Sequence, residues 1–169
     1  MIIRVSDIDD DGLTVDDVGA VPSPYTDRGW RLDGLQLHVE RDAQDVFIRG
    51  HLLATVPQVC GRCLESFPEH VRADVDLRFV PRPATGDAVE LGAKDLDLCF
   101  YVADQIDMNV VIESETTLAL PMKPLCREDC RGLCPSCGAN RNLTACGCDA
   151  RPPDPRLAVL KDLAARLSH

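Results

Sequence analysis

Cysteine is the residue type with the clearest chemistry in this 169-residue chain, which holds nine of them. Six lie within the stretch CREDCRGLCPSCGANRNLTACGCD, and four of these form two short pairs, CPSC and CGC. Each spacing lets both thiolates of a pair face one point, and four converging thiolates are what Zn²⁺ prefers in a structural site. We therefore predict a zinc site, called site 1, with the ligands Cys134, Cys137, Cys146 and Cys148.

Four further cysteines remain that could bind a second metal ion. Cys126 and Cys130 lie four residues apart, a spacing that suits one helical turn, and Cys60 and Cys63 form another CxxC pair after an expected strand. Together they could form a second zinc site, called site 2, which would fasten the cysteine-rich segment to the preceding domain. The alternative is a single zinc ion, with Cys60 and Cys63 free or structural, and the spacing leaves both possibilities open. Cys99, in the apolar stretch LCFYV, has no partner in the sequence and is expected in the core.

A thiol redox role is the main alternative to metal binding. In that role Cys60 and Cys63 would act as a dithiol, or oxidation would release the zinc ion as a switch. Redox CxxC pairs usually begin a helix, whose dipole lowers the pKa of a thiol. Here CGRCLESFPEHV runs into an expected strand, with Pro68 close behind the pair. We therefore favour metal binding over a redox reaction.

No other group of residues forms a convincing catalytic or binding motif. Asp7, Asp9 and Asp11 resemble the start of a calcium-binding loop, but Val18 stands where that loop needs its final acidic ligand. The histidines are scattered, at positions 38, 51, 70 and 169. A zinc ion with four thiolate ligands also has no open position for water. We expect a protein that is not an enzyme and has no small-molecule substrate.

The composition is that of a folded protein in a reducing compartment. Hydrophobic residues make up 45% of the chain and aromatic residues only 4%, so the core must consist mainly of Val, Leu, Ile and Ala. The first residues contain no basic segment followed by an apolar run, and no apolar run reaches the length of a membrane span. We therefore expect a cytoplasmic protein with no membrane partner, in which clustered cysteines bind metal rather than form disulfides.

Charge is unevenly distributed along the chain, whose net charge is −10. Residues 1–120 carry 10 Lys and Arg against 23 Asp and Glu, whereas residues 121–169 carry 8 against 5. A protein this acidic is not expected to coat nucleic acid. The two parts are instead expected to face different partners, with the cysteine-rich end mildly basic.

Alternating hydrophobic and polar residues predict a strand-rich first domain. The clearest pattern places one face of a strand at Val71, Ala73, Val75, Leu77 and Phe79. The predicted strands cover residues 1–8, 34–41, 45–60, 67–81 and 97–102, and the predicted loops cover residues 20–34 and 81–95.

Two helices are predicted, one on each side of the cysteine-rich segment. The first begins after Asp107, a suitable cap, and ends before Pro121. Its residues at helical spacing are Met108, Val111, Ile112, Glu115 and Leu118. The second begins at Asp154 and Pro155 and carries a narrow apolar stripe.

The predicted fold class is α+β, in three parts. Residues 1–121 are expected to form an antiparallel β-rich domain with one or two helices. Residues 122–150 are expected to form a zinc-binding arm, and residues 151–169 a C-terminal helix.

The cysteine motifs and their surroundings resemble those of a known family. The stretch CGRCL after a strand, then LALPMKPLCREDCRGLCPSCGANRN followed by CGCD, then DPRLAVLKDL occur in the order and at the distances typical of the YceD family. The resemblance covers about residues 30–165. It implies a role in making or stabilising large-subunit ribosomal RNA, in a bacterial or plastid setting, and it implies no catalytic residues.

The resemblance and the charge distribution together lead to an expected function. We expect a ribosome biogenesis factor that supports the accumulation or processing of large-subunit ribosomal RNA and contains structural zinc. Its expected partner is a large-subunit ribosomal precursor. The acidic domain would dock on a basic ribosomal protein, and the arm would contact ribosomal RNA weakly.

Overall fold

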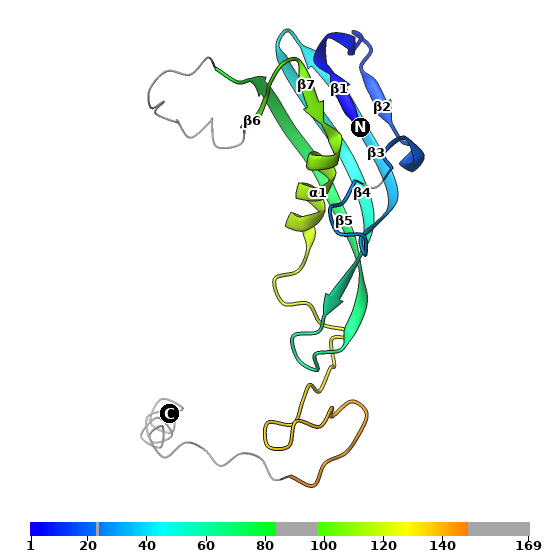
Figure 1. Cartoon of the computed structure of the whole chain (residues 1–169), viewed down its shortest axis with the longest axis vertical. Helices are drawn as coiled ribbons and strands as arrows, with labels where there is room; N and C mark the ends of the chain where they lie inside the picture. Colours follow the sequence, from blue (N-terminus) through cyan, green and yellow to red (C-terminus); the bar gives the residue numbers. More distant parts are fainter. Residues whose placement is uncertain (23, 84–97, 149–169) are drawn as a thin grey trace, which may run out of the picture.

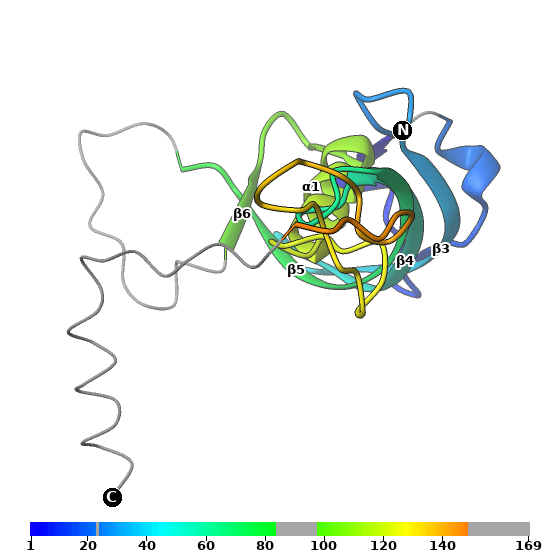
Figure 2. The same ribbon diagram turned by 90° about the horizontal axis from the view of Figure 1, so that it is seen from below.

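A computed structural model of the protein describes residues 1–22, 24–83 and 98–148. The predicted C-terminal helix, residues 151–169, and most of the loop predicted at residues 81–95 lie outside this part of the chain. Figure 1 shows an elongated arrangement, with the strands and one helix at one end and the arm at the other. In Figure 2, viewed along the long axis from the arm, the arm overlies the end of the sheet, so it continues the long axis of the domain.

A five-stranded sheet forms the frame of the domain, in the order β2–β3–β4–β5–β6. Its strands are β2 (Leu13–Val15), β3 (Arg31–Asp42), β4 (Asp45–Val59), β5 (Ser66–Pro81) and β6 (Leu98–Tyr101). Neighbouring strands are antiparallel except for β5 and β6, which run parallel. The predicted antiparallel β-rich domain is therefore found, except that this one pair, β5 and β6, is parallel. β6 lies beside the last residues of β5, Arg78–Pro81, and runs in the same direction, a pairing that a tight hairpin cannot connect.

A second sheet of two strands joins the beginning and the end of the domain. In it, β1 (Ile2–Arg4) pairs antiparallel with β7 (Gln105–Asp107). The strand predicted at residues 1–8 is shorter than expected, because the short 3₁₀ helix η1 (Val5–Asp7) follows β1 directly. A second short helix, η2 (Val18–Ala20), lies between β2 and β3.

The long β4–β5 hairpin is the element that reaches toward the arm. Its strands stay paired along their whole length. The buried side chains of β5 include Val71, Ala73, Val75 and Phe79, as the alternating pattern predicted. Leu77 is only partly buried and packs against the core. The turn of the hairpin, residues 60–65, therefore projects from a well-packed base.

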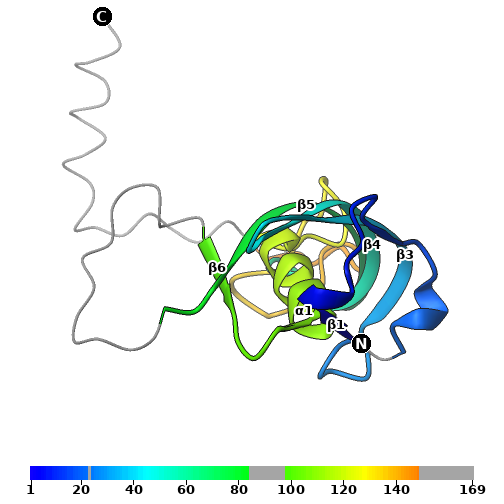
Figure 3. The same ribbon diagram turned by 90° about the horizontal axis from the view of Figure 1, so that it is seen from above.

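The helix α1 (Met108–Ala119) lies in the hollow of the curved sheet, as Figure 3 shows. Asp107 caps it, because its carboxylate accepts a hydrogen bond of 2.9 Å from the N–H of Asn109. The predicted start of this helix is therefore confirmed. Its buried side chains are Met108, Val111, Ile112 and Thr116. Leu118, which also follows the helical spacing, is exposed.

The core lies between α1 and the hollow face of the sheet and consists mainly of Val, Leu and Ile, as the composition required. Leu37, Ile48, Leu52 and Ile112 are among its fully buried side chains. Burial of one such side chain stabilises the fold by about 1.5–3 kcal/mol. No helix within the described ranges is long and apolar enough to cross a membrane.

Candidate metal centres

Site 2 begins at the turn of the β4–β5 hairpin, which carries Cys60 and Cys63. The N–H of Cys60 donates to the carbonyl of Glu65 at 2.9 Å, and the N–H of Leu64 donates to the carbonyl of Cys60 at 3.0 Å. Leu64 has a φ of +61°, the left-handed conformation that lets the chain reverse after the second cysteine. The pair thus leads into a strand, whereas redox CxxC pairs usually begin a helix.

The other two cysteines of site 2 come from the chain after α1. The N–H of Gly61 donates to the carbonyl of Pro124 at 2.8 Å and so holds this segment beside the hairpin turn. Arg62 then donates from Nη1 to the carbonyls of Glu128 and Cys130, each at 3.0 Å. These contacts bring the second cysteine pair to the hairpin.

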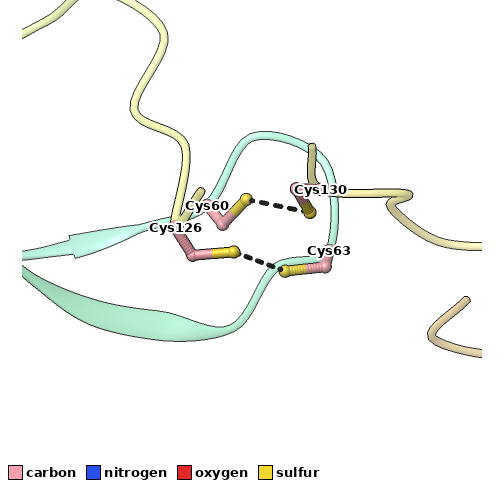
Figure 4. Close-up of side chains that lie close together, drawn as sticks. All are labelled: Cys60, Cys63, Cys126 and Cys130. Atoms are coloured by element: carbon pink, nitrogen blue, oxygen red, sulfur yellow. Dashed lines mark hydrogen bonds between the residues drawn. The ribbon is translucent and has the colours of Figure 1, made fainter. Parts of the chain in front are cut away.

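The four thiols of site 2 converge, as Figure 4 shows. The Sγ atoms of Cys60 and Cys130 lie 3.8 Å apart, and those of Cys63 and Cys126 lie 3.7 Å apart. A disulfide would need about 2.05 Å between sulfurs. Bonds of about 2.3 Å to a tetrahedral Zn²⁺ place its sulfur ligands about 3.8 Å from one another. The donor type and the spacing therefore fit zinc.

Site 1 repeats the same turn within the arm. The N–H of Cys134 donates to the carbonyl of Ala139 at 2.8 Å, and the N–H of Gly138 donates to the carbonyl of Cys134 at 2.9 Å. Gly138 has a φ of +75° and takes the position that Leu64 holds in site 2. The ligand atoms that lie within 4.8 Å of one another are those of Cys134, Cys137, Cys146 and Cys148. The structure thus brings together both sets of four cysteines, including the set that the spacing had left open.

The pKa values of the site 2 thiols differ strongly from one another. Backbone N–H groups, that of Cys126 first, lower the pKa of Cys60 to about 6. For Cys130, burial opposes ionisation, but a side-chain amide and a backbone N–H outweigh it and hold the pKa below its ordinary value. Burial and the neighbouring thiols raise the pKa of Cys126 to about 12. The N–H of Glu65 favours ionisation of Cys63, but burial and the nearby thiols outweigh it and raise that pKa.

The thiols of site 1 divide in the same way. The N–H groups of Cys137 and Ser136 lower the pKa of Cys134 to about 6. The neighbouring thiols, that of Cys137 first, raise the pKa of Cys148 to about 12, and the Cys134 thiol raises that of Cys146. A divalent cation among four such thiols would offset the repulsion between thiolates and favour loss of the remaining protons. The four-cysteine donor set of each site fits a closed, structural metal centre.

Cys99 lies outside both sites. It belongs to β6, is partly buried and packs against the core, so the expectation of a core cysteine is met only in part. Burial, and after it the carboxylate of Glu115, raises the pKa of its thiol. Such a thiol is a weak nucleophile at neutral pH.

Sequence reasoning missed the side chains that support the two sites. Arg62 clamps the arm to the hairpin, and Asn142 donates from Nδ2 to the Sγ of Cys130 at 3.3 Å. In the sequence, the only signal for these two residues is their position: Arg62 lies inside the CxxC pair of site 2, and Asn142 lies between the CxxC and CxC pairs of site 1. It does not reveal their partners, which lie on other segments of the chain.

Comparison with known proteins finds one family model that matches the part of the chain containing both cysteine groups. The model of the family described as large ribosomal RNA subunit accumulation protein YceD matches residues 48–164. The chain belongs to the YceD family. The resemblance seen in the cysteine motifs is therefore confirmed.

Relatives of this YceD chain occur in mycobacteria and in a plant. A protein of Mycobacterium tuberculosis, named only as uncharacterized, is 35% identical over 113 residues, which are 66% of this chain and 52% of that protein. A maize protein is named large ribosomal RNA subunit accumulation protein YCED homolog 1, chloroplastic. It is 26% identical over 175 residues, covering 88% of this chain and 57% of that protein. The chain thus spans about half the length of the curated relatives it matches. No solved structure matches it.

Proposed function

We propose that this chain is a ribosome biogenesis factor, not an enzyme, that supports the accumulation or processing of large-subunit ribosomal RNA in the bacterial cytoplasm. The observation that carries the proposal is the family match, which spans residues 48–164 and so includes all eight cysteines of the two sites. The name of the maize relative, which refers to accumulation of the large ribosomal RNA subunit, supports the same role.

The proposal includes one zinc ion at each site, with a structural role. The arm supports this part of the proposal, because among its described residues only Cys130, Gly132 and Cys134 are buried. A segment with so little apolar packing needs another source of stability, and structural zinc supplies folding free energy directly. The fit of the sulfur spacing in site 2 to tetrahedral zinc supports it independently.

Two surfaces could serve two kinds of partner. The acidic β-rich domain exposes carboxylates such as Asp74 and Asp76 on β5 and suits a basic ribosomal protein. The exposed cations of the arm are Lys123, Arg127, Arg131 and Arg141. Four thiolates on each zinc ion leave two negative charges per site, which offset these cations. Contact of the arm with ribosomal RNA is therefore weak and salt-dependent, and recruitment relies mainly on the protein partner.

The role is tested in a strain depleted of this protein and complemented with variants. Depletion is expected to lower large-subunit ribosomal RNA relative to small-subunit ribosomal RNA, and an unchanged ratio would refute the proposal.

The two surfaces are tested with charge-reversal variants in pull-down experiments. A variant with Arg127, Arg131 and Arg141 changed to Glu should no longer recover RNA but should keep its protein partner. A variant with Asp74→Lys and Asp76→Lys should do the reverse. If both variants recover the same precursors as the unchanged protein, the assignment of two surfaces is wrong.

A thiol redox role is the second candidate, and the lowered pKa of Cys60 is the observation in its favour. The two further thiols that lie against this pair favour a closed centre instead, because metal-bound thiolates are poor attackers of disulfides. An insulin-reduction assay separates the two. Activity equal to a thioredoxin control would establish the redox role, whereas no activity above background supports the structural one.

A further inference from the structure

One polar side chain links the two sites directly. Asn142 lies between the two cysteine pairs of site 1, and its Nδ2 donates to the Sγ of Cys130 in site 2 at 3.3 Å. Its Oδ1 accepts the N–H of Arg131, the residue after Cys130, at 2.8 Å. Both ends of the Asn142 amide are therefore fixed beside a ligand of site 2.

The turn that carries Asn142, residues 138–144, lies between the two cysteine pairs of site 1. It begins directly after Cys137 and ends two residues before Cys146. The Oδ1 of Asn140 accepts the N–H of Asn142 at 3.0 Å and its Nδ2 at 2.9 Å, which shapes the turn from within. None of the residues of the turn is buried. Hydrogen bonds to other segments hold the middle of the turn, such as that from the N–H of Arg141 to the carbonyl of Gly132 at 2.9 Å, and the predicted ligands of site 1 flank its two ends.

The same turn forms part of the wall of a cavity at site 2. The cavity has a volume of about 370 Å³, and it is lined by the site 2 ligands Cys63 and Cys126 and by the turn residues Asn140, Asn142 and Leu143. Asn140 also donates from Nδ2 to the Oε1 of Glu65 at 3.3 Å, which ties the turn to the hairpin. Displacing the turn would widen the access of water and chelators to these two ligands, which already face the cavity.

We propose that Asn142 couples the two metal sites. Metal at site 1 fixes the turn, and the turn holds the Asn142 amide against Cys130 and forms part of the wall of the cavity at site 2. This coupling rests on the metal binding proposed above. Removing a group that hydrogen-bonds a metal ligand lowers metal affinity by about 10- to 100-fold. Because coupling is reciprocal, metal at site 2 strengthens binding at site 1 by the same factor.

The first test measures metal retention at site 2 in the full chain. Cadmium NMR gives one signal for each site, and a chelator challenge gives the rate of release from each. Asn142→Asp keeps an acceptor for the N–H of Arg131 but cannot donate to sulfur, and Asn142→Ala removes both contacts. Both variants are expected to shift the site 2 signal and to release its metal about 10-fold faster. Asn109→Ala is the matched control, because Asn109 contacts the amino group of Met1 and should leave both signals unchanged.

A double-mutant cycle decides whether site 1 acts through Asn142. Removal of site 1 by Cys137→Ser and Cys148→Ser should also speed release from site 2 about 10-fold. It should add little when Asn142→Ala is already present. Unchanged release in the Asn142 variants, or effects that simply add, would overturn the coupling. A chain that takes up no metal at all refutes the zinc proposal instead, and the depletion experiment tests the ribosomal role separately.

Discussion

Sites 1 and 2 are built on the same turn but are supported by different amounts of protein. In both, the first cysteine of a CxxC pair makes backbone hydrogen bonds with the residues four and five positions later. Site 2 lies at the end of the β4–β5 hairpin, and three of its four cysteines are buried, Cys60 completely. In site 1 only Cys134 is buried, while Cys137 and Cys148 are exposed. The difference indicates that the two four-cysteine sites have different structural roles. Site 2 would fasten the arm to the domain, and site 1 would stabilise the fold of the arm itself.

The largest effect is expected from loss of a ligand at site 2. Cys60 is fully buried, and Cys60→Ser leaves only three thiolates at site 2, so this change should release the metal and free the arm from the hairpin. Structural zinc contributes on the order of 10 kcal/mol to folding. Residues 122–148 should therefore lose protection from hydrogen exchange, and the midpoint of thermal unfolding should fall. Metal analysis and hydrogen exchange followed by mass spectrometry measure both effects.

Cys134→Ser is the matched variant in site 1, because Cys134 holds the same position in its turn as Cys60. We expect it to lose one metal ion and to lose protection mainly in residues 134–148, with the β4–β5 hairpin still protected. The comparison between the sites would be wrong if the two variants gave the same pattern of exchange.

A second large effect is expected from pH. In the absence of metal, the raised pKa values of Cys63 and Cys126 in site 2, and of Cys146 and Cys148 in site 1, keep these thiols protonated at neutral pH. Metal binding must remove these protons, so each ion should displace at least about two protons near pH 7. Affinity therefore rises with pH in this range and falls further as pH drops through about 6, where Cys60 and Cys134 gain protons. Calorimetry in two buffers of different ionisation enthalpy counts the protons that metal binding releases. Release of no protons would contradict the expected protonation of these thiols.

The two sites could be predicted from the sequence to different degrees. All four ligands of site 1 lie within residues 134–148, so local spacing was enough to group them. Site 2 joins residues 60–63 to residues 126–130, and the sequence could only count the cysteines that were left. These two segments come together because of the length of the β4–β5 hairpin and the hydrogen bonds of Arg62. Neither feature can be read from the hydrophobic pattern of the sequence.

The fold shows the same limit. The alternation in β5 and the cap at Asp107 are local signals, and the structure confirms both elements. The parallel pairing of β6 depends on the path of the chain between β5 and β6, and the sequence pattern does not contain it. Leu118 follows the helical spacing but lies in the last turn of α1, where burial depends on what packs nearby. Local patterns therefore predicted the elements, whereas the contacts between them needed the structure.

A smaller effect is expected at Arg62, which supports site 2 without being a ligand. Arg62→Ala removes the two hydrogen bonds to the carbonyls of Glu128 and Cys130 and leaves all four cysteines in place. Hydrogen bonds from a charged group contribute about 1.5–3 kcal/mol, and the partial exposure of this one places the loss near the lower end. Hydrogen exchange in the segment 126–133 should become faster, with metal still bound. Arg62→Lys is the control that can reach one carbonyl and should show a smaller change. Equal exchange in all three proteins would show that the ligands alone hold the arm.

The smallest expected effect lies at the left-handed residue four positions after the first cysteine of each CxxC pair, Leu64 in site 2 and Gly138 in site 1. A residue other than glycine in the left-handed conformation costs about 1 kcal/mol, and Leu64 takes it at a φ of +61°. Leu64 is 64% exposed, so Leu64→Gly should lose little packing. Relief of the left-handed strain, about 1 kcal/mol, is largely offset by the greater freedom of glycine in the unfolded chain, about 0.4–1 kcal/mol, so the free energy of unfolding should change little. Gly138→Ala should destabilise by about 1 kcal/mol, for conformational reasons alone, because an added Cβ at Gly138 would meet no atom within 4 Å. Denaturant unfolding of the metal-loaded proteins measures both changes. If Leu64→Gly destabilises as much as Gly138→Ala, the Leu64 side chain makes contacts worth more than its strain, and the two turns are not equivalent.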